Sequence, residues 1–185
     1  MVEDLFRETE QKMERSLVAL RKDLSRIRTG RASLALLEGI TVDAYGTPTP
    51  LHQMATLAVP ESRLITIQPW DRTQINPIEK SIQRSDLGLT PVNDGKLIRL
   101  AIPPLTADRR KDLVKQVKKI GEEAKVTLRS VRREGNESLK ELEKSKNISE
   151  DDWRRSQDTM QKLTDRYITQ VDEVLSAKEH DILEV

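Results

Sequence analysis

The sequence predicts an α+β protein: a long antiparallel three-helix bundle with a small α/β domain of mixed strands inserted in it. Apolar residues recur every three or four positions near the N-terminus and through most of the C-terminal half, which is the helical period. All eight prolines fall in the intervening part, where apolar and polar residues alternate as in strands. Charged residues make up 34% of the chain and aromatic residues 3%, a composition typical of long exposed helices with aliphatic seams. We therefore expect the bundle at residues 1–30 and 105–185, and the inserted domain at residues 31–104.

The first helix is predicted to run from Val2 to about Arg28. Apolar side chains keep helical spacing over this range, and the first glycine of the chain is Gly30. At 1.5 Å per residue such a helix is roughly 40 Å long. Gly30 is expected to end it, because glycine accepts the positive φ that the residue after a helix often adopts.

The middle part contains three strand candidates and one short helix. The strand candidates are residues 40–44, 64–67 and 97–102. Asn93-Asp94-Gly95 predicts a turn before the last of them. Asn76 is expected to cap the short helix, with Pro77 at its first position. Ile78 and Ile82 should then face inward.

Two further helices are predicted in the C-terminal half. Thr106 can cap a helix that runs to about Lys146. Ser149 with Asp152 resembles a capping box, so that the last helix starts at Glu150. Each of the three long helices is apolar on one stripe only, and a three-helix bundle is the simplest way to bury all three stripes.

The first of these C-terminal helices carries a seam of basic residues. Six cations follow a spacing of three and four residues and therefore share one helical face: Lys111, Lys115, Lys118, Lys125, Arg129 and Arg132. An apolar series with the same spacing runs beside them: Val114, Val117, Gly121, Ala124, Leu128, Val131 and Gly135. One face is thus suited to packing and the other to an anionic partner such as RNA. The alternative is a solvated face that is balanced by acidic neighbours such as Glu122 and Glu123.

The net charge of +1 conceals opposed segments. Residues 106–149 hold 13 basic and 8 acidic side chains, whereas residues 150–185 hold 5 basic and 10 acidic ones. A nearly neutral chain attracts nucleic acid only weakly as a whole. Any binding of phosphate therefore depends on the local basic seam.

Several classes of protein are disfavoured by the composition. The chain has no cysteine, and its two histidines lie in different predicted domains, so we expect no metal site, no cofactor and no catalytic site. No stretch approaches the 18 or so apolar residues of a membrane span, and the N-terminus has no apolar segment of the signal-peptide type. We expect a soluble cytoplasmic protein that is not an enzyme and has no membrane partner.

Six short motifs, in this order and spacing, carry a resemblance to a known family. They are Arg28-Thr29-Gly30-Arg31-Ala32, Val42-Asp43-Ala44-Tyr45-Gly46, Pro48-Thr49-Pro50-Leu51, Asp86-Leu87-Gly88-Leu89, Ile102-Pro103-Pro104-Leu105-Thr106 and Val131-Arg132-Arg133. Together they resemble the bacterial ribosome recycling factor family, and the resemblance spans the whole chain. Several long motifs in the right order are far more specific than one short pattern.

The resemblance implies an L-shaped, two-domain protein whose helical arm lies on large-subunit ribosomal RNA. With elongation factor G and GTP, members of the family split the post-termination 70S ribosome into subunits, which releases mRNA and tRNA. The resemblance also implies that the protein binds the free 50S subunit and is a monomer in solution. It implies no covalent chemistry by the factor itself. The runner-up is a helical adaptor that binds a protein through its charged faces and has no RNA role.

By matching position, the resemblance places the RNA contacts on five arginines. They are Arg28, Arg31, Arg129, Arg132 and Arg133. Arginine pairs with phosphate in a bidentate manner, and Arg132 is the first residue we would test. Two features depart from many relatives: Glu134-Gly135 stands where Asp-Ala is common, and Trp153 stands where a polar residue is common. Gly135 costs roughly 1 kcal/mol of helix propensity relative to alanine, so a bend is expected there.

The two chain crossings between the predicted domains form a candidate hinge. It comprises Gly30 and Arg31 on one side, and Pro103, Pro104 and Leu105 on the other. Because neither crossing is helical, the inserted domain could reorient without breaking a helix. The alternative is that these residues only mark the boundary between the two domains and do not act as a hinge.

Overall fold

The structure is a computed structural model that describes residues 1–184. The chain divides into two compact units, one formed by Met1–Ile27 with Ala107–Glu184 and the other by Arg28–Thr106. We refer to them as the helical unit and the strand-containing unit.

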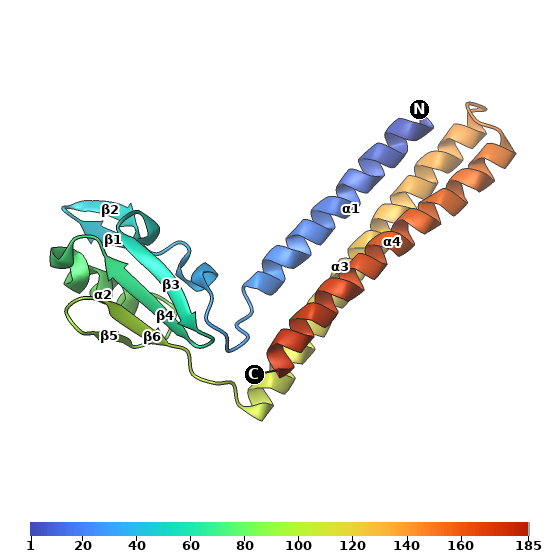
Figure 1. The fold of residues 1–185 in the computed structure, drawn as a ribbon. Coiled ribbons are helices and arrows are strands. Elements are labelled where there is room, and N and C mark those ends of the chain that lie inside the picture. Colours follow the sequence, from blue (N-terminus) through green and yellow to red (C-terminus); the bar gives the residue numbers. More distant parts are fainter. Residues whose placement is uncertain (185) are drawn as a thin grey trace. The chain divides into compact units, whose positions relative to one another are not determined.

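Three long helices make up the helical unit: α1 (Val2–Ser25), α3 (Ala107–Lys144) and α4 (Glu150–Leu183). Each packs against the other two, and they run side by side in Figure 1. The interior is aliphatic, with side chains such as Leu17, Leu128 and Met160 almost fully buried. The three-helix architecture predicted from the apolar spacing is confirmed.

The end of α1 differs from the prediction. The helix stops at Ser25, so Arg28 is not helical and Gly30 does not act as the residue that ends it. The amides of Arg26 and Ile27 donate to the carbonyls of Asp23 and Leu24 at 3.3 and 3.1 Å. These bonds span three residues, so the last turn is tightened and the chain leaves the helix early.

Two local hydrogen bonds define the connection between α3 and α4, one at the end of α3 and one at the start of α4. α3 ends at Lys144, and Lys146 has a φ of 61°. Next to it the amide of Asn147 donates to the carbonyl of Leu142 at 2.9 Å, which satisfies one of the last carbonyls of α3. α4 begins at Glu150 as predicted, and the hydroxyl of Ser149 accepts from the amide of Asp152 at 3.1 Å.

Two buried glycines bring α3 close to α4. α3 is helical without interruption through Gly121 and Gly135. A Cβ at Gly121 would lie 2.7 Å from Cδ2 of Leu175, and one at Gly135 would lie 2.7 Å from Cε of Met160. Both glycines therefore sit where α4 side chains fill the space of a β-carbon.

The strand-containing unit has one short α-helix, three short 3₁₀ helices and six strands. The elements are β1 (Thr41–Ala44), β2 (Thr47–Pro50), β3 (Ala55–Glu61), β4 (Leu64–Pro69), α2 (Ile75–Arg84), β5 (Pro91–Asn93) and β6 (Ile98–Ala101). β1 and β2 form a two-stranded sheet, and the other four strands form a sheet in the order β3-β4-β6-β5. Every strand pairing in residues 1–184 is antiparallel, so the prediction of mixed strands is wrong. Short turns join β1 to β2 and β3 to β4, and such turns allow only antiparallel pairing.

The start of α2 also differs from the prediction. The helix begins at Ile75, one residue before the predicted cap, and follows a short 3₁₀ turn at Arg72–Gln74. The side chain of Asp71 accepts from the amide of Thr73 at 3.0 Å and caps this 3₁₀ turn. α2 itself follows Gln74 and has no side-chain cap, so the prediction that Asn76 caps the helix is wrong. Inward placement of Ile78 and Ile82 is confirmed, since both are almost fully buried in the core of this unit.

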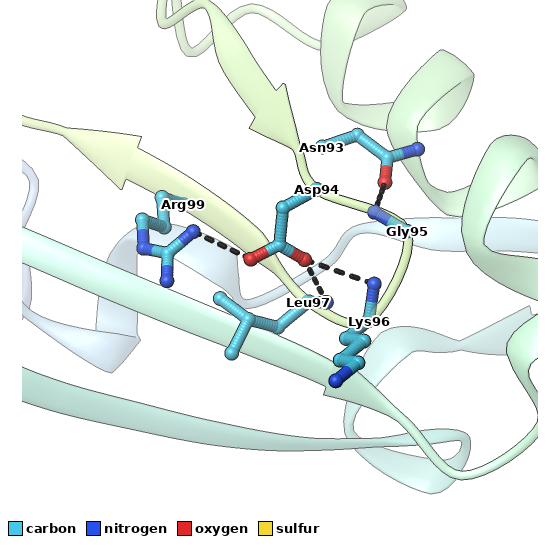
Figure 2. A network of polar contacts seen from close by, with 6 residues as sticks. All are labelled: Asn93, Asp94, Gly95, Lys96, Leu97 and Arg99. Atoms are coloured by element: carbon cyan, nitrogen blue, oxygen red, sulfur yellow. Dashed lines mark hydrogen bonds and ion pairs between the residues drawn. The ribbon is translucent and has the colours of Figure 1, made fainter.

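The predicted turn before β6 is present and is held by Asp94 (Figure 2). One carboxylate oxygen accepts from the amides of Lys96 and Leu97, each at 2.9 Å, and the other pairs with Arg99 at 2.7 Å. The bonds from the backbone amides, that of Leu97 first, lower the pKa of Asp94 from its ordinary value to about 2. Gly95 supplies the positive φ of 89° that the turn requires.

Candidate nucleic-acid interface

The basic seam lies on α3, beside the stripe that packs into the helical unit. Val117, Gly121, Leu128, Val131 and Gly135 of the predicted apolar series are buried. Of the six cations, Lys111, Lys115, Lys118 and Arg129 are exposed, whereas Lys125 and Arg132 are partly buried. The predicted division of α3 into a packing face and a charged face is confirmed, but the six cations are not equivalent.

Lys125 is engaged in the contact between α3 and α4. Its ammonium lies 2.6 Å from a carboxylate oxygen of Asp172 on α4 and 3.8 Å from Glu122 on its own helix. Only 16% of its side chain is exposed. The two carboxylates compensate the positive charge of the Lys125 ammonium, so its attraction for a phosphate is weak. Lys125 is therefore better suited to joining helices than to binding RNA.

Arg132 is held in position by α4 but retains free donors. Its Nη1 donates to the side-chain oxygen of Gln161 at 3.1 Å, and Gln161 in turn donates to Asp165 at 2.8 Å. A guanidinium carries five N–H donors, so this contact leaves most of them available. A neutral partner also leaves the positive charge of Arg132 uncompensated.

Arg129 and Arg133 lie within one helical turn of Arg132 and are exposed. In the described chain neither has a hydrogen bond or an ion pair. The adjacent carboxylate of Glu134 is 3.0 Å from the ammonium of Lys12 on α1. Because Lys12 neutralises Glu134, the three arginines form the least compensated positive cluster on this part of α3. We call Arg129, Arg132 and Arg133 the arginine cluster.

The other two predicted contacts, Arg28 and Arg31, belong to the strand-containing unit. Both are exposed and lie after the end of α1. The guanidinium of Arg28 donates to the backbone carbonyl of Leu87 and, at 3.4 Å, to that of Asp86. Arg28 thus fastens the 86–87 loop, a role that the sequence does not reveal.

Residues 1–184 contain no cluster of three or more histidine, cysteine or acidic side chains that could hold a metal ion. His180 lies in the helical unit, 2.9 Å from Glu184, and His52 lies in the strand-containing unit. No described helix is long and apolar enough to cross a membrane.

The hinge residues have a defined local environment. Gly30 adopts a φ of 79°, and a Cβ there would lie 3.1 Å from Cγ of Leu105. The two chain crossings are therefore neighbours within the strand-containing unit, and Gly30 leaves room for Leu105. A larger residue at Gly30 would be strained both by its φ and by this contact.

Comparison with known proteins gives a consistent result. The family model described as ribosome recycling factor matches residues 20–183. The chain is 56% identical over 184 residues to the ribosome-recycling factor of Nitratidesulfovibrio vulgaris (strain DP4), with 100% of this chain and 99% of that protein covered. It is 53% identical over 185 residues to the ribosome-recycling factor of Brevibacillus brevis, with full coverage of both.

Two solved structures are similar over the full length. The solution structure of a ribosome recycling factor matches with a TM-score of 0.78 at 42% identity, covering 100% of this chain and 98% of that one. The other is a ribosome recycling factor of T. thermophilus in models that include the E. coli elongation factor G bound to the E. coli post-termination complex. It matches with a TM-score of 0.66 at 43% identity, and 99% of each chain is covered.

Proposed function

The chain belongs to the ribosome recycling factor family, and from this membership we propose that it recycles ribosomes after termination. It binds the post-termination ribosome on large-subunit RNA and, with elongation factor G and GTP, separates the subunits so that mRNA and tRNA are released. The factor acts as a monomer in the cytoplasm and catalyses no covalent reaction. Full-length similarity to named members of the family is the observation that carries this proposal.

RNA binding is assigned to the arginine cluster of α3, together with Arg28 and Arg31 of the strand-containing unit. The cluster is supported by its exposure and by the neutral partner of Arg132. Regularly placed guanidinium groups suit the phosphates of a folded RNA. Exposed Lys111, Lys115 and Lys118 add attraction over a longer range, which salt screens more readily.

The crossings at Gly30-Arg31 and at Pro103, Pro104 and Leu105 are proposed to act as a hinge. Both are non-helical, so a change of their dihedral angles leaves α1 and α3 intact. Movement of the strand-containing unit would then transmit the action of elongation factor G to the bundle.

The decisive experiment is a subunit-splitting assay on post-termination ribosomes with elongation factor G and GTP. Light scattering should fall faster when this protein is added than when it is omitted. Omission of elongation factor G or of GTP serves as the control and should abolish the acceleration. Splitting at the uncatalysed rate in the complete mixture would overturn the proposal.

RNA contact is tested by Arg132→Ala, with Arg7→Ala as a matched control. Arg7 is an exposed arginine on α1, 3.8 Å from Asp4, and lies outside the arginine cluster. Affinity for the 50S subunit is measured between low and moderate salt. Loss of one phosphate contact should weaken binding and reduce the log–log salt slope by about 0.7 to 0.9. Arg7→Ala should leave the slope unchanged.

A flat salt response of the unmodified protein, or unaltered binding by Arg132→Ala, would favour the helical adaptor instead. Because the guanidinium of Arg132 is partly exposed and has a neutral partner, its loss should affect folding little. Urea denaturation of the variant separates a folding defect from a binding defect.

The hinge is tested with one introduced cysteine in each unit, joined by a short bifunctional maleimide. The chain has no cysteine of its own, so the introduced pair provides the only thiols. Crosslinked protein should bind 50S subunits but fail in subunit splitting. The same variant without crosslinker, and a pair placed within α3 and α4 alone, are the controls. Full splitting activity after crosslinking would exclude the hinge.

A further inference from the structure

The outer edge of β1 has free backbone hydrogen-bonding groups. In the register of this hairpin Thr41 lies opposite Pro50 and Asp43 opposite Pro48. The amide of Leu51 donates to the carbonyl of Ile40, which makes the next pair, Thr41 and Pro50, a non-hydrogen-bonded pair. Successive pairs alternate, so the N–H and C=O groups of Thr41 and Asp43 point away from β2.

The hairpin turn supports this assignment of the register. Tyr45 and Gly46 both have positive φ values, of 52° and 78°, as in a two-residue type I′ turn. Such a turn is closed by a hydrogen-bonded pair, here Ala44 and Thr47. Counting back from this pair again places the backbone groups of Thr41 and Asp43 on the outer edge.

These backbone groups have no partner in the part of the chain that the structure describes. β1 pairs with β2 only, and no other hydrogen bond reaches Thr41 or Asp43. An exposed edge of this kind is a template for another strand.

β1 differs from the other edge strands of this unit in that it contains no proline. β2 carries Pro48 and Pro50, β3 carries Pro60 and β5 carries Pro91, whereas the residues of β1 are Thr-Val-Asp-Ala. Proline has no N–H to offer and blocks the addition of a strand. The contrast is clearest with β2, whose two prolines lie on its outer edge, whereas Pro60 of β3 lies beyond the regular part of its pairing with β4.

The outer edge of β1 opens onto a groove whose opposite wall includes α2. The groove has a volume of about 540 Å³. Thr41 and Asp43 line one side, and Ser81 and Arg84 of α2 line another. A further cavity beside it shares Asp43, Ser81 and Arg84 and extends the groove along α2 to Lys80.

The lining provides both apolar and cationic contacts. Leu36, Ile40 and Leu87 supply apolar surface. Arg84 is exposed and forms no hydrogen bond or ion pair with any residue in 1–184, and Lys80 precedes it by one helical turn. These two cations are available to a carboxylate, whereas Arg28, at another part of the lining, is occupied by the carbonyls of the 86–87 loop.

We propose that the groove between β1 and α2 binds an extended segment of a partner protein, which adds to the outer edge of β1 as a new strand. The free N–H and C=O groups of Thr41 and Asp43 alternate as a strand requires. One apolar side chain of the segment lies on Leu36 and Leu87, and one acidic side chain meets Arg84. This inference does not depend on the proposed role in ribosome recycling.

The lining disfavours RNA as the occupant. Glu38, Asp43 and Asp86 bring three carboxylates to the groove, and these repel a continuous chain of phosphates. A peptide needs to bring only one negative side chain, to the wall formed by α2. Its backbone also matches the free edge of β1, which a nucleic acid does not.

The test uses the full chain, labelled with ¹⁵N, and a capped seven-residue peptide of alternating threonine and valine with one central glutamate. The peptide should shift the amide resonances of Thr41 and Asp43 and slow their exchange with solvent. A peptide N-methylated at two adjacent central residues loses a donor on each edge and should bind about tenfold more weakly. Replacing glutamate by glutamine should weaken binding about two- to fivefold.

Arg84→Ala and Arg72→Ala form a matched pair of variants. Arg72 is an exposed arginine of the same unit that does not line the groove. Arg84→Ala should reproduce the loss caused by the glutamine peptide, and Arg72→Ala should not. Unchanged Thr41 and Asp43 amides at millimolar peptide, or equal binding of the N-methylated peptide, would overturn the proposal. The proposal would also be overturned if a ten-residue oligouridine shifted the amide resonances of Thr41 and Asp43 as much as the peptide does. Self-association of the protein through β1, seen in sedimentation, would overturn it as well.

Discussion

Gly121→Ala should destabilise the helical unit, because α4 occupies the space that a β-carbon would need. The new carbon would lie 2.7 Å from Cδ2 and 3.0 Å from Cγ of Leu175, and closer still to Cδ1. Ordinary carbon contacts are about 3.5–4.0 Å. Both methyl groups and the branch carbon are affected, so rotation of the Leu175 side chain about its last bond cannot relieve the clash. The helices must separate or Leu175 must change rotamer.

The expected magnitude follows from two opposing effects. Overpacking a well-filled interior costs about 1–3 kcal/mol. Alanine regains roughly 1 kcal/mol of helix propensity relative to glycine. We therefore expect a net loss of up to about 2 kcal/mol in the free energy of unfolding. It is measured from the urea midpoint by circular dichroism, where α1, α3 and α4 dominate the signal.

Gly135→Ala is the matched control on the same helix. Its β-carbon would meet Cε of Met160 at 2.7 Å and Sδ at 3.1 Å, both on a flexible side chain that can move aside. The gain in helix propensity should then offset the contact, and the stability should change by less than about 1 kcal/mol. Combining Gly121→Ala with Leu175→Ala should cost less than the sum of the two single changes, since the clash disappears. The reasoning is refuted if Gly121→Ala is as stable as Gly135→Ala, or if the two changes are additive.

Three further outcomes are expected. Asp94→Asn should make the stability of the strand-containing unit less dependent on pH. The folded pKa of Asp94 is about 2, below its ordinary value of 3.8. The contribution of Asp94 to the free energy of unfolding is therefore present above about pH 4 and is lost as the pH falls through 2. Acid denaturation followed by the amide resonances of β6 measures this, and an unchanged acid limb would contradict it. Asp71→Asn should let Tyr45 ionise at lower pH, because the hydrogen bond to the Asp71 carboxylate raises the pKa of Tyr45; ultraviolet titration of the phenol reports it, with Tyr167 as the internal control. Ser149→Ala should cost about 1 kcal/mol of stability in urea denaturation, because the amide of Asp152 loses its capping oxygen, whereas Ser149→Thr should retain most of it.

The bundle could be predicted because its signal is local to each helix. Apolar spacing alone identifies the buried stripe, and residues such as Leu17 and Leu128 are indeed fully buried. The helix ends were harder, since they depend on individual hydrogen bonds. The bond from the amide of Arg26 to the carbonyl of Asp23 ends α1 before Gly30 is reached. The residue types at these positions do not predict this hydrogen bond.

Of the strands that were not predicted, β2 was missed because of its prolines. Thr47-Pro48-Thr49-Pro50 carries turn-like composition, yet it forms β2. Its prolines are tolerated because they occupy positions whose N–H would point outward, away from β1. Whether a strand lies at an edge is a property of the whole sheet, so the sequence of β2 alone cannot reveal it.

The candidate interface shows the same division between local and tertiary information. Spacing along α3 presents six similar cations, but their partners come from other helices: Asp172 engages Lys125, and Lys12 neutralises Glu134 beside the arginines. Which carboxylate faces which cation depends on the register between helices, and Gly121 and Gly135 help to set that register for α3 and α4. A change at Gly121 should therefore disturb the pairing of Lys125 with Asp172 as well as the packing on Leu175. The charge of the interface is consequently a property of the assembled bundle, and substitutions in its core can alter binding without touching an arginine.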